Sequence, residues 1–140
     1  MSVRNLDSLF DPASIVVIGA SERPASVGAT VWRNLTGGGF TGPVYPVNHK
    51  HSHLGGHTVY ARVADLPQVP ELAVICTPPA TVPGQVRDLA ALGTRAAVIL
   101  TAGLTNERDF PVPSEPLPVR VAVYGNKVPR WRGQTFHQLT

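Results

Sequence analysis

The sequence predicts an α/β domain with a doubly wound, mostly parallel Rossmann-like sheet, followed by an irregular Pro-rich tail. Strands covered on both faces are apolar throughout, and β-branched runs of this kind alternate here with helical or turn-rich stretches. Such a pattern requires right-handed crossovers, and we expect the sheet order third, second, first, fourth, fifth. The expected strands, in chain order, are Ile15–Ile18, Val44–Val47, Leu72–Cys76, Ala96–Leu100 and Val119–Tyr124.

The first helix is expected to begin after Ser26, whose hydroxyl can cap it, and to end at residues 37–39, which are all glycine. Its inward face would carry Val27, Val31 and Leu35, at spacings of four residues.

The second helix is expected to begin near Thr81, with Pro83 in its first turn, and to end at Gly93. Between the two helices, the crossover of residues 48–71 would hold a short strand at Thr58–Tyr60 and a helical turn near Val63–Leu66.

Composition places this domain in a narrow class. The chain has 140 residues, of which 43% are hydrophobic and 15% charged, enough for one packed core. Its single cysteine, Cys76, excludes an internal disulfide and favours a reducing cytoplasm. No apolar run approaches the roughly 18 residues of a membrane span, and the N-terminus lacks the apolar segment of a signal peptide. We therefore expect a cytoplasmic protein without a membrane partner.

The net charge of +3 and the pI near 9.5 favour an anionic ligand. The twelve Lys and Arg residues are spread along the chain and form no basic stripe with interleaved aromatics. We therefore expect a small anionic ligand and do not expect nucleic-acid binding.

The clearest candidate site is the turn Gly19–Ala20–Ser21 after the first strand, followed by Gly28 in the first turns of the next helix. Small residues let a phosphate approach the backbone, where free N–H groups and the positive end of the helix stabilise its charge. The alternative is a tight turn of any α/β protein, with Gly19 present only for its geometry.

The residues after the second expected strand narrow the class of ligand. NAD-binding folds generally carry Gly-x-Gly-x-x-Gly and an acidic residue about 20 positions later, and neither is evident here. Asn48 and Lys50 follow the second strand instead, and a cation there suits the ribose phosphate of NADP or coenzyme A (CoA). A solvated lysine on a loop is the alternative for Lys50.

Two further loops would line the same crevice, because ligands of open parallel sheets lie across the carboxyl ends of the strands. Thr77–Pro79 follows the third expected strand, and its prolines remove two amide donors and stiffen the wall. Thr101–Gly103 follows the fourth and offers a hydroxyl and close backbone approach. The alternative for each loop is that its residues are those of an ordinary loop without a ligand.

Taken together, these pieces resemble the CoA-binding domain of ADP-forming acyl-CoA synthetases, the group of succinyl-CoA synthetase alpha subunits and acetate–CoA ligases. The resemblance covers roughly residues 6–104, so we expect a domain at 1–104 and a poorly structured tail at 105–140. The stretches that carry it are Leu9–Ser21, Gly42–Asn48, Asp65–Pro67 with Glu71–Ile75, and Ala97–Gly103.

The resemblance implies a CoA-binding function. It would place the diphosphate on Gly19, Ala20 and Ser21, and a basic contact on Asn48 or Lys50. It further implies a third-strand loop of Thr77 and Pro78, and a fourth-strand loop of Leu100, Thr101 and Ala102. Acetyltransferases also carry this domain, and an NADP-binding redox domain remains the rival.

The resemblance also implies missing parts. The phosphohistidine domain and the ATP-grasp module of such ligases have no room in 140 residues, so this chain alone should bind and not catalyse. The family's ending after the fourth strand is replaced here by a Pro-rich stretch, which suggests an N-terminal fragment from a truncated or frameshifted gene. An ATP-grasp subunit or domain is the implied partner.

Other reactive residues have ordinary explanations. His49, His51, His53 and His57 crowd one loop, where they could bind zinc or simply be exposed loop histidines. Cys76 ends an apolar strand and fits buried packing better than a nucleophile. No arrangement of residues predicts a catalytic centre.

Overall fold

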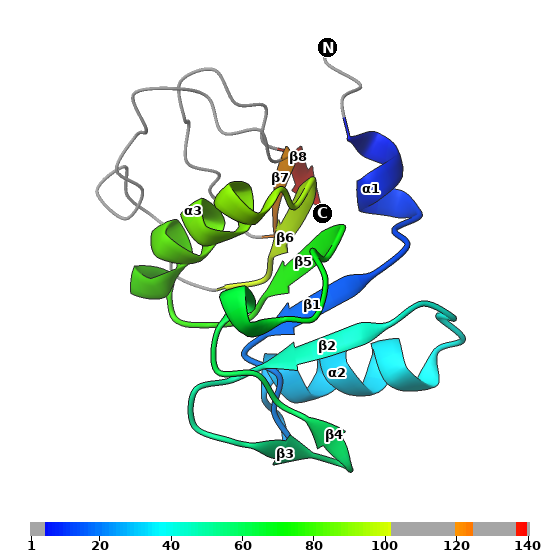
Figure 1. Cartoon of the computed structure of the whole chain (residues 1–140), viewed down its shortest axis with the longest axis vertical. Coiled ribbons are helices and arrows are strands. Elements are labelled where there is room, and N and C mark those ends of the chain that lie inside the picture. The colour runs from blue at the N-terminus through cyan, green and yellow to red at the C-terminus, as the bar shows by residue number, and fades with distance from the viewer. Residues whose placement is uncertain (1–4, 102–119, 125–136, 140) are drawn as a thin grey trace.

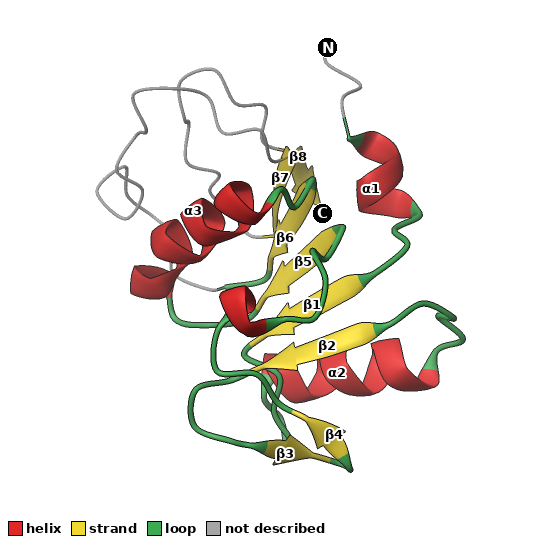
Figure 2. Cartoon of the chain, viewed as in Figure 1, coloured by secondary structure: helices red, strands yellow, loops and turns green. Residues whose placement is uncertain are grey.

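The computed structural model describes residues 5–101, 120–124 and 137–139, and its centre is a six-stranded parallel sheet (Figures 1 and 2). The predicted α/β class with a parallel sheet is confirmed. The strands, from one edge to the other, are β2 (Val44–Val47), β1 (Ile15–Ile18), β5 (Leu72–Ile75), β6 (Ala96–Ile99), β7 (Arg120–Tyr124) and β8 (His137–Leu139).

The expected order of the strands is wrong at one place. Leu72–Ile75 lies between β1 and β6, whereas the prediction put it outside β2. Residues 48–71 are long enough to return past β1, and the position outside β2 is taken by Tyr60 through a single parallel bridge to Val47. The chain therefore reverses direction across the sheet at β1, which leaves the ends of β1, β2 and β5 beside one another.

Two separate cores lie on the two faces of the sheet, as a doubly wound fold requires. Alternate strand residues such as Val16, Ile18 and Ile75 pack with α3 (Val82–Leu92) on one face. Their neighbours Ile15 and Val17 pack with α2 (Val27–Gly37) on the other (Figure 1). All four residues of β1 are buried, which is why its sequence shows no polar alternation.

Helix α2 begins where predicted, because the Ser26 hydroxyl accepts a hydrogen bond from the Ala29 amide at 3.1 Å. Its buried face differs from the prediction. Val27 is 50% exposed, and Trp32 and Gly28 are buried instead, while Val31 and Leu35 are half-buried. In the first turn of α2, Gly28 packs against the end of β1, and the neighbouring valine is exposed.

Helix α3 follows the prediction closely. It begins at Val82 with Pro83 in its first turn, and Gly93 ends it in the left-handed conformation with φ of 96°. The Gly93 amide then donates to the carbonyls of Leu89 and Ala90, which completes the cap. The buried residues Val82, Val86 and Leu89 form the inward face of the helix.

Smaller elements complete the described chain. The predicted turn near Val63–Leu66 is a 3₁₀ helix, η1 (Val63–Asp65), and the predicted strand at 119–124 is β7. A second 3₁₀ turn, η2 (Pro79–Thr81), leads into α3. The strand expected at Thr58–Tyr60 is only a short hairpin strand plus the Tyr60 bridge. That hairpin strand is β4 (His57–Thr58). Elements that were not predicted are α1 (Leu6–Phe10), the partner strand β3 (His53–Leu54) of the hairpin, and β8.

Glu71 links several chain segments at the amino ends of the strands. Its carboxylate oxygens accept hydrogen bonds from the Ser8 hydroxyl and the Ala13 amide, both at 2.9 Å. Its own amide donates to the Ser14 hydroxyl at 3.0 Å, and its carbonyl accepts from the Ala96 amide. The two bonds to the carboxylate lower the pKa of Glu71, the Ala13 amide contributing most and the Ser8 hydroxyl next.

Candidate functional site

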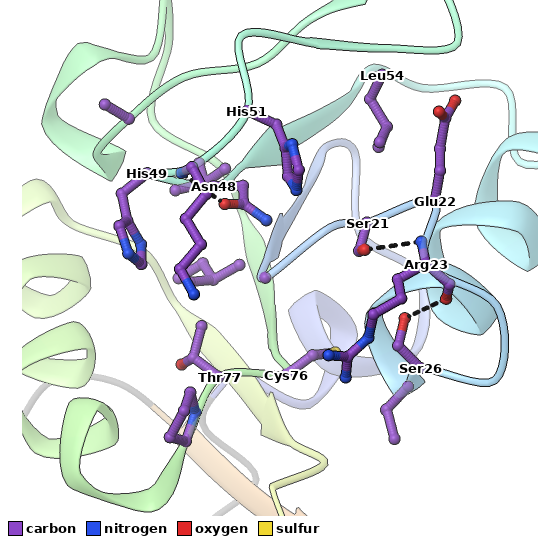
Figure 3. A pocket seen from close by; sticks show the side chains of 18 of the residues that line it. Ser21, Glu22, Arg23, Ser26, Asn48, His49, His51, Leu54, Cys76 and Thr77 are labelled. Carbon is purple, nitrogen blue, oxygen red and sulfur yellow. Dashed lines mark hydrogen bonds between the residues drawn. The ribbon is translucent and has the colours of Figure 1, made fainter.

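A cleft of about 790 Å³ lies at the carboxyl ends of β1, β2 and β5, where the sequence predicted the ligand (Figure 3). This is where the strand order reverses, the usual ligand position in open α/β sheets. Its walls are the β1–α2 loop, the loop after β2, the β3 strand and the loop after β5. The cleft has the size of a small-molecule site.

Two glycines bring the walls of the cleft together. Gly19 adopts φ of +90°, and a Cβ on it would lie 3.1 Å from Thr77 Cγ2 and 3.2 Å from the Cys76 carbonyl oxygen. A Cβ on Gly28 would collide with the carbonyl oxygen of Gly19. Gly28 therefore lets the start of α2 lie directly against the end of β1. This packing role is independent of any contact with a ligand.

The amides of the predicted phosphate loop are not all free. The Gly19 amide donates to the Val47 carbonyl at 2.8 Å, so it extends the pairing of β1 with β2 and is unavailable to a ligand. For the amides of Ala20 and Ser21, no acceptor occurs among residues 5–101. The first amides of α2, at Val27 and Gly28, lack intrahelical partners by the geometry of a helix start. The side chain of Ala20 is fully buried in the core, so only its backbone can serve a ligand.

Asn48 ties the loop after β1 to the loop after β2. Its side-chain nitrogen donates to the Ala20 carbonyl at 2.9 Å, and its side-chain oxygen accepts from the Lys50 amide at 2.8 Å. The Asn48 amide donates to the Tyr60 carbonyl. The side chain thus fixes the loop after β2 against the loop after β1, and Lys50 stands on that loop, exposed at the wall of the cleft.

The remaining predicted residues divide into wall and support. Thr77 and Pro78 line the cleft. Thr101 is buried and lies behind the wall, where its hydroxyl donates to the Thr77 carbonyl at 2.7 Å. Leu100 packs at the core and is not in the lining described here, and Ala102 lies outside the described residues.

The charged lining contains residues that the sequence analysis did not single out. Arg23 and Glu22 lie in the β1–α2 loop and line the cleft with Lys50. They stand between the two glycines of the candidate site, and that position was the signal that could have selected them. Arg23 and Lys50 together carry more charge than the one carboxylate in this lining, so the wall favours an anion.

The histidine-rich loop also borders the cleft. His49, His51 and His53 are exposed lining residues. In the described part of the chain, no three His, Cys, Asp or Glu side chains are grouped so as to hold a metal ion. His57 lies elsewhere, with its ring edge-to-face on Trp32 at 5.1 Å between centroids.

Cys76 directly follows β5 and lines the floor of the cleft. Burial raises the pKa of its thiol to about 11, because the apolar surroundings disfavour the thiolate. A thiol of that kind is a poor nucleophile at neutral pH.

Comparison with known proteins decides the family. Residues 13–110 match the model of the CoA-binding domain. This chain belongs to that family. The CoA-binding domain is 43% identical over 104 residues to a trans-feruloyl-CoA synthase from an unknown prokaryotic organism, covering 74% of this chain and 15% of that protein. It is 34% identical over 103 residues to the alpha subunit of ADP-forming acetate–CoA ligase I of Pyrococcus furiosus, covering 71% of this chain and 22% of the subunit.

Solved structures agree with the fold of the CoA-binding domain. The acetyl-CoA synthetase 1 of Candidatus Korarchaeum cryptofilum, solved with phosphate and ADP, superposes with a TM-score of 0.73 at 35% identity, covering 84% of this chain and 26% of that one. The chain therefore spans about a quarter or less of the proteins named here. Among the helices in the described ranges, none is long and apolar enough to cross a membrane.

Proposed function

We propose that this chain supplies the CoA site of an ADP-forming acyl-CoA synthetase, with CoA bound as a substrate in the cleft of β1, β2 and β5. The observation that carries the proposal is a strand-end cleft in which backbone donors stand together with two cations that have no ion-pair partner among the described residues. The family match and the ADP-forming ligases among the relatives support the choice of CoA over NADP. The reaction of the longer protein and its acyl substrate are part of this proposal.

The diphosphate of CoA would lie at the β1–α2 loop. The amides of Ala20 and Ser21 and the first turn of α2 present donors there, and the helix dipole favours negative charge. Gly28 is required because a side chain would push the helix start away from this loop.

The ribose phosphate would lie near Lys50, on the opposite wall. Asn48 serves as a positioning residue, since both ends of its side-chain amide are used to hold the Lys50 loop against Ala20. Thr101 acts in the same way on the third wall by holding the Thr77 carbonyl.

The described residues provide binding and orientation, and the acid activation step would belong to other modules. CoA brings the thiol that accepts the acyl group, and this chain's residues would hold its phosphates so that the pantetheine end leaves the cleft. An ATP-grasp domain or subunit is the partner that we propose for the activation step, as the ADP-forming relatives suggest.

Calorimetric titration of the folded chain with CoA tests this function, after a cooperative thermal transition has established that the chain is folded. We expect one site with a dissociation constant in the micromolar range or weaker, and no displacement of CoA by NADPH. Folded protein that gives no CoA heat would refute the proposal. Displacement of CoA by equimolar NADPH would favour the redox alternative.

A further inference from the structure

The side chain of Arg23 enters the cleft from a loop whose backbone is fixed on both sides of it. The Arg23 amide donates to the Ser21 hydroxyl at 2.9 Å. Its carbonyl accepts from the Ser26 hydroxyl at 2.8 Å and from the Ser26 amide at 3.2 Å. The backbone polar groups of Arg23 are therefore satisfied within the loop, and the guanidinium is left for another partner.

No carboxylate of the described residues pairs with the Arg23 guanidinium. The one ion pair among the described residues joins Arg62 to Asp65. Figure 3 shows the Arg23 side chain running toward Cys76, while the neighbouring Glu22 side chain points in the opposite direction from the guanidinium. An arginine held over a cleft without a counter-ion is placed to receive an anion from solution.

The geometry points to Arg23 as a specificity-determining residue that contacts the diphosphate of the ligand. This inference rests on the proposed CoA site. Arg23 shares its loop with Ser21, on the wall where backbone amides also face the cleft, whereas Lys50 stands on the loop after β2. A guanidinium can engage two phosphate oxygens at once through its planar fork, which a lysine cannot do. The two cations are thereby assigned to different phosphates.

The test compares Arg23→Gln and Arg23→Lys with Lys50→Gln, using CoA and dephospho-CoA, which lacks only the ribose phosphate. We expect Arg23→Gln to weaken both ligands equally, by about tenfold or more, since hydrogen bonds to charged groups are the stronger ones. Arg23→Lys should recover only part of that loss. Lys50→Gln should weaken CoA and leave dephospho-CoA unchanged.

The outcomes separate this inference from the proposed function. If the unmodified chain binds CoA and Arg23→Gln, folded with an unchanged thermal midpoint, binds it as well, this inference alone is wrong. A loss confined to CoA, with dephospho-CoA unaffected, would move Arg23 to the ribose phosphate and overturn the assignment. An unmodified chain that binds neither nucleotide would overturn both proposals.

Discussion

The two ends of the parallel sheet treat polar groups in opposite ways. At the amino ends of the strands, the Glu71 carboxylate accepts hydrogen bonds from the Ser8 hydroxyl and the Ala13 amide. At the carboxyl ends, Arg23 and Lys50 line a cleft with no ion-pair partner among the described residues. At the first end the carboxylate ties chain segments together, and at the second end two cationic side chains stay available to a ligand.

Hydrogen bonds also link chain segments at both ends of the sheet. Polar atoms around Glu71 join α1, β1, β5 and β6 across long separations in sequence. In the cleft, the Arg23 amide is held locally by the Ser21 hydroxyl. The side chains of Asn48 and Thr101 hold the neighbouring loops through the carbonyls of Ala20 and Thr77. Substitutions at the two ends should therefore separate stability from binding.

The largest effect is expected from adding one methyl group at the cleft. Gly28→Ala would place a Cβ against the Gly19 carbonyl and should cost about 3 kcal/mol of unfolding free energy, with loss of CoA binding, as overpacking a tight contact does. Gly84→Ala is the matched control, because Gly84 lies in the first turn of α3 with open space around its Cβ position. It should stabilise the chain by about 0.5–1 kcal/mol. Chemical denaturation of both variants checks this; equal destabilisation would contradict the packing role of Gly28.

The next effect concerns the thiol in the floor of the cleft. With the pKa of Cys76 raised to about 11, its thiolate fraction at pH 8 should be roughly a hundredfold below that of an ordinary thiol. Alkylation by iodoacetamide should accordingly be slow in the folded chain and accelerate with pH well beyond pH 9. Mass spectrometry of folded and denatured chain measures the ratio, and equal rates would show that Cys76 is not buried in this way.

Lys50→Gln and Glu71→Gln should have complementary effects. The first should lower CoA affinity, and the second should lower stability. Lys50→Gln should weaken CoA about tenfold with stability unchanged within about 0.5 kcal/mol. Glu71→Gln should leave CoA affinity unchanged and cost about 1 kcal/mol at pH 7, a modest value because solvent screens this carboxylate. A Glu71 variant that binds CoA poorly while stable would contradict the division of labour.

The same carboxylate gives a pH dependence. The folded-state pKa of Glu71 lies below its usual value of 4.5, so its contribution to stability is present above that value. It is lost as the pH falls through the folded-state pKa. The stability of Glu71→Gln should therefore converge on that of the unmodified chain in acid, which thermal melts between pH 7 and pH 3 would show.

The smallest effect on stability is expected at Thr94, whose polar group, unlike that of Glu71, has no partner among the described residues. The hydroxyl of Thr94, a buried residue before β6, has no hydrogen-bond partner among the described residues. Thr94→Val replaces that hydroxyl with a methyl group of similar shape and should raise the unfolding free energy by up to about 1 kcal/mol. A clear loss of stability would reveal a partner for the hydroxyl and bring this residue into line with Glu71.

The sequence predicted the parts of the fold whose signals are local. Continuous apolar runs located β1, β2, β5 and β6, and the Ser26 and Gly93 signals located the limits of the helices. The position of Leu72–Ile75 in the sheet could not be read, because it depends on where a long crossover returns. Val27 was misplaced for a related reason, since periodicity does not reveal that Gly28, and not Val27, packs against the end of β1.

The sequence predicted which loops line the site. It did not predict which of their polar atoms are already hydrogen-bonded within the chain. Gly19 was expected to offer a free amide, but that amide is used by Val47, and only the structure shows which amides of the loop have no acceptor. Thr101 and Asn48 were expected near the ligand, yet their side chains hold neighbouring loops through bonds that no spacing rule reveals.

Amide chemical shifts of the isotope-labelled chain, recorded during a CoA titration, compare the two ends of the sheet residue by residue. The resonances of Ala20, Ser21, Gly28 and Lys50 should move together with ligand concentration, while those of Glu71 and Ala13 stay still. Saturable shifts centred on Glu71, with the signals of the β1–α2 loop unmoved, would place the ligand at the wrong end of the sheet and contradict the account.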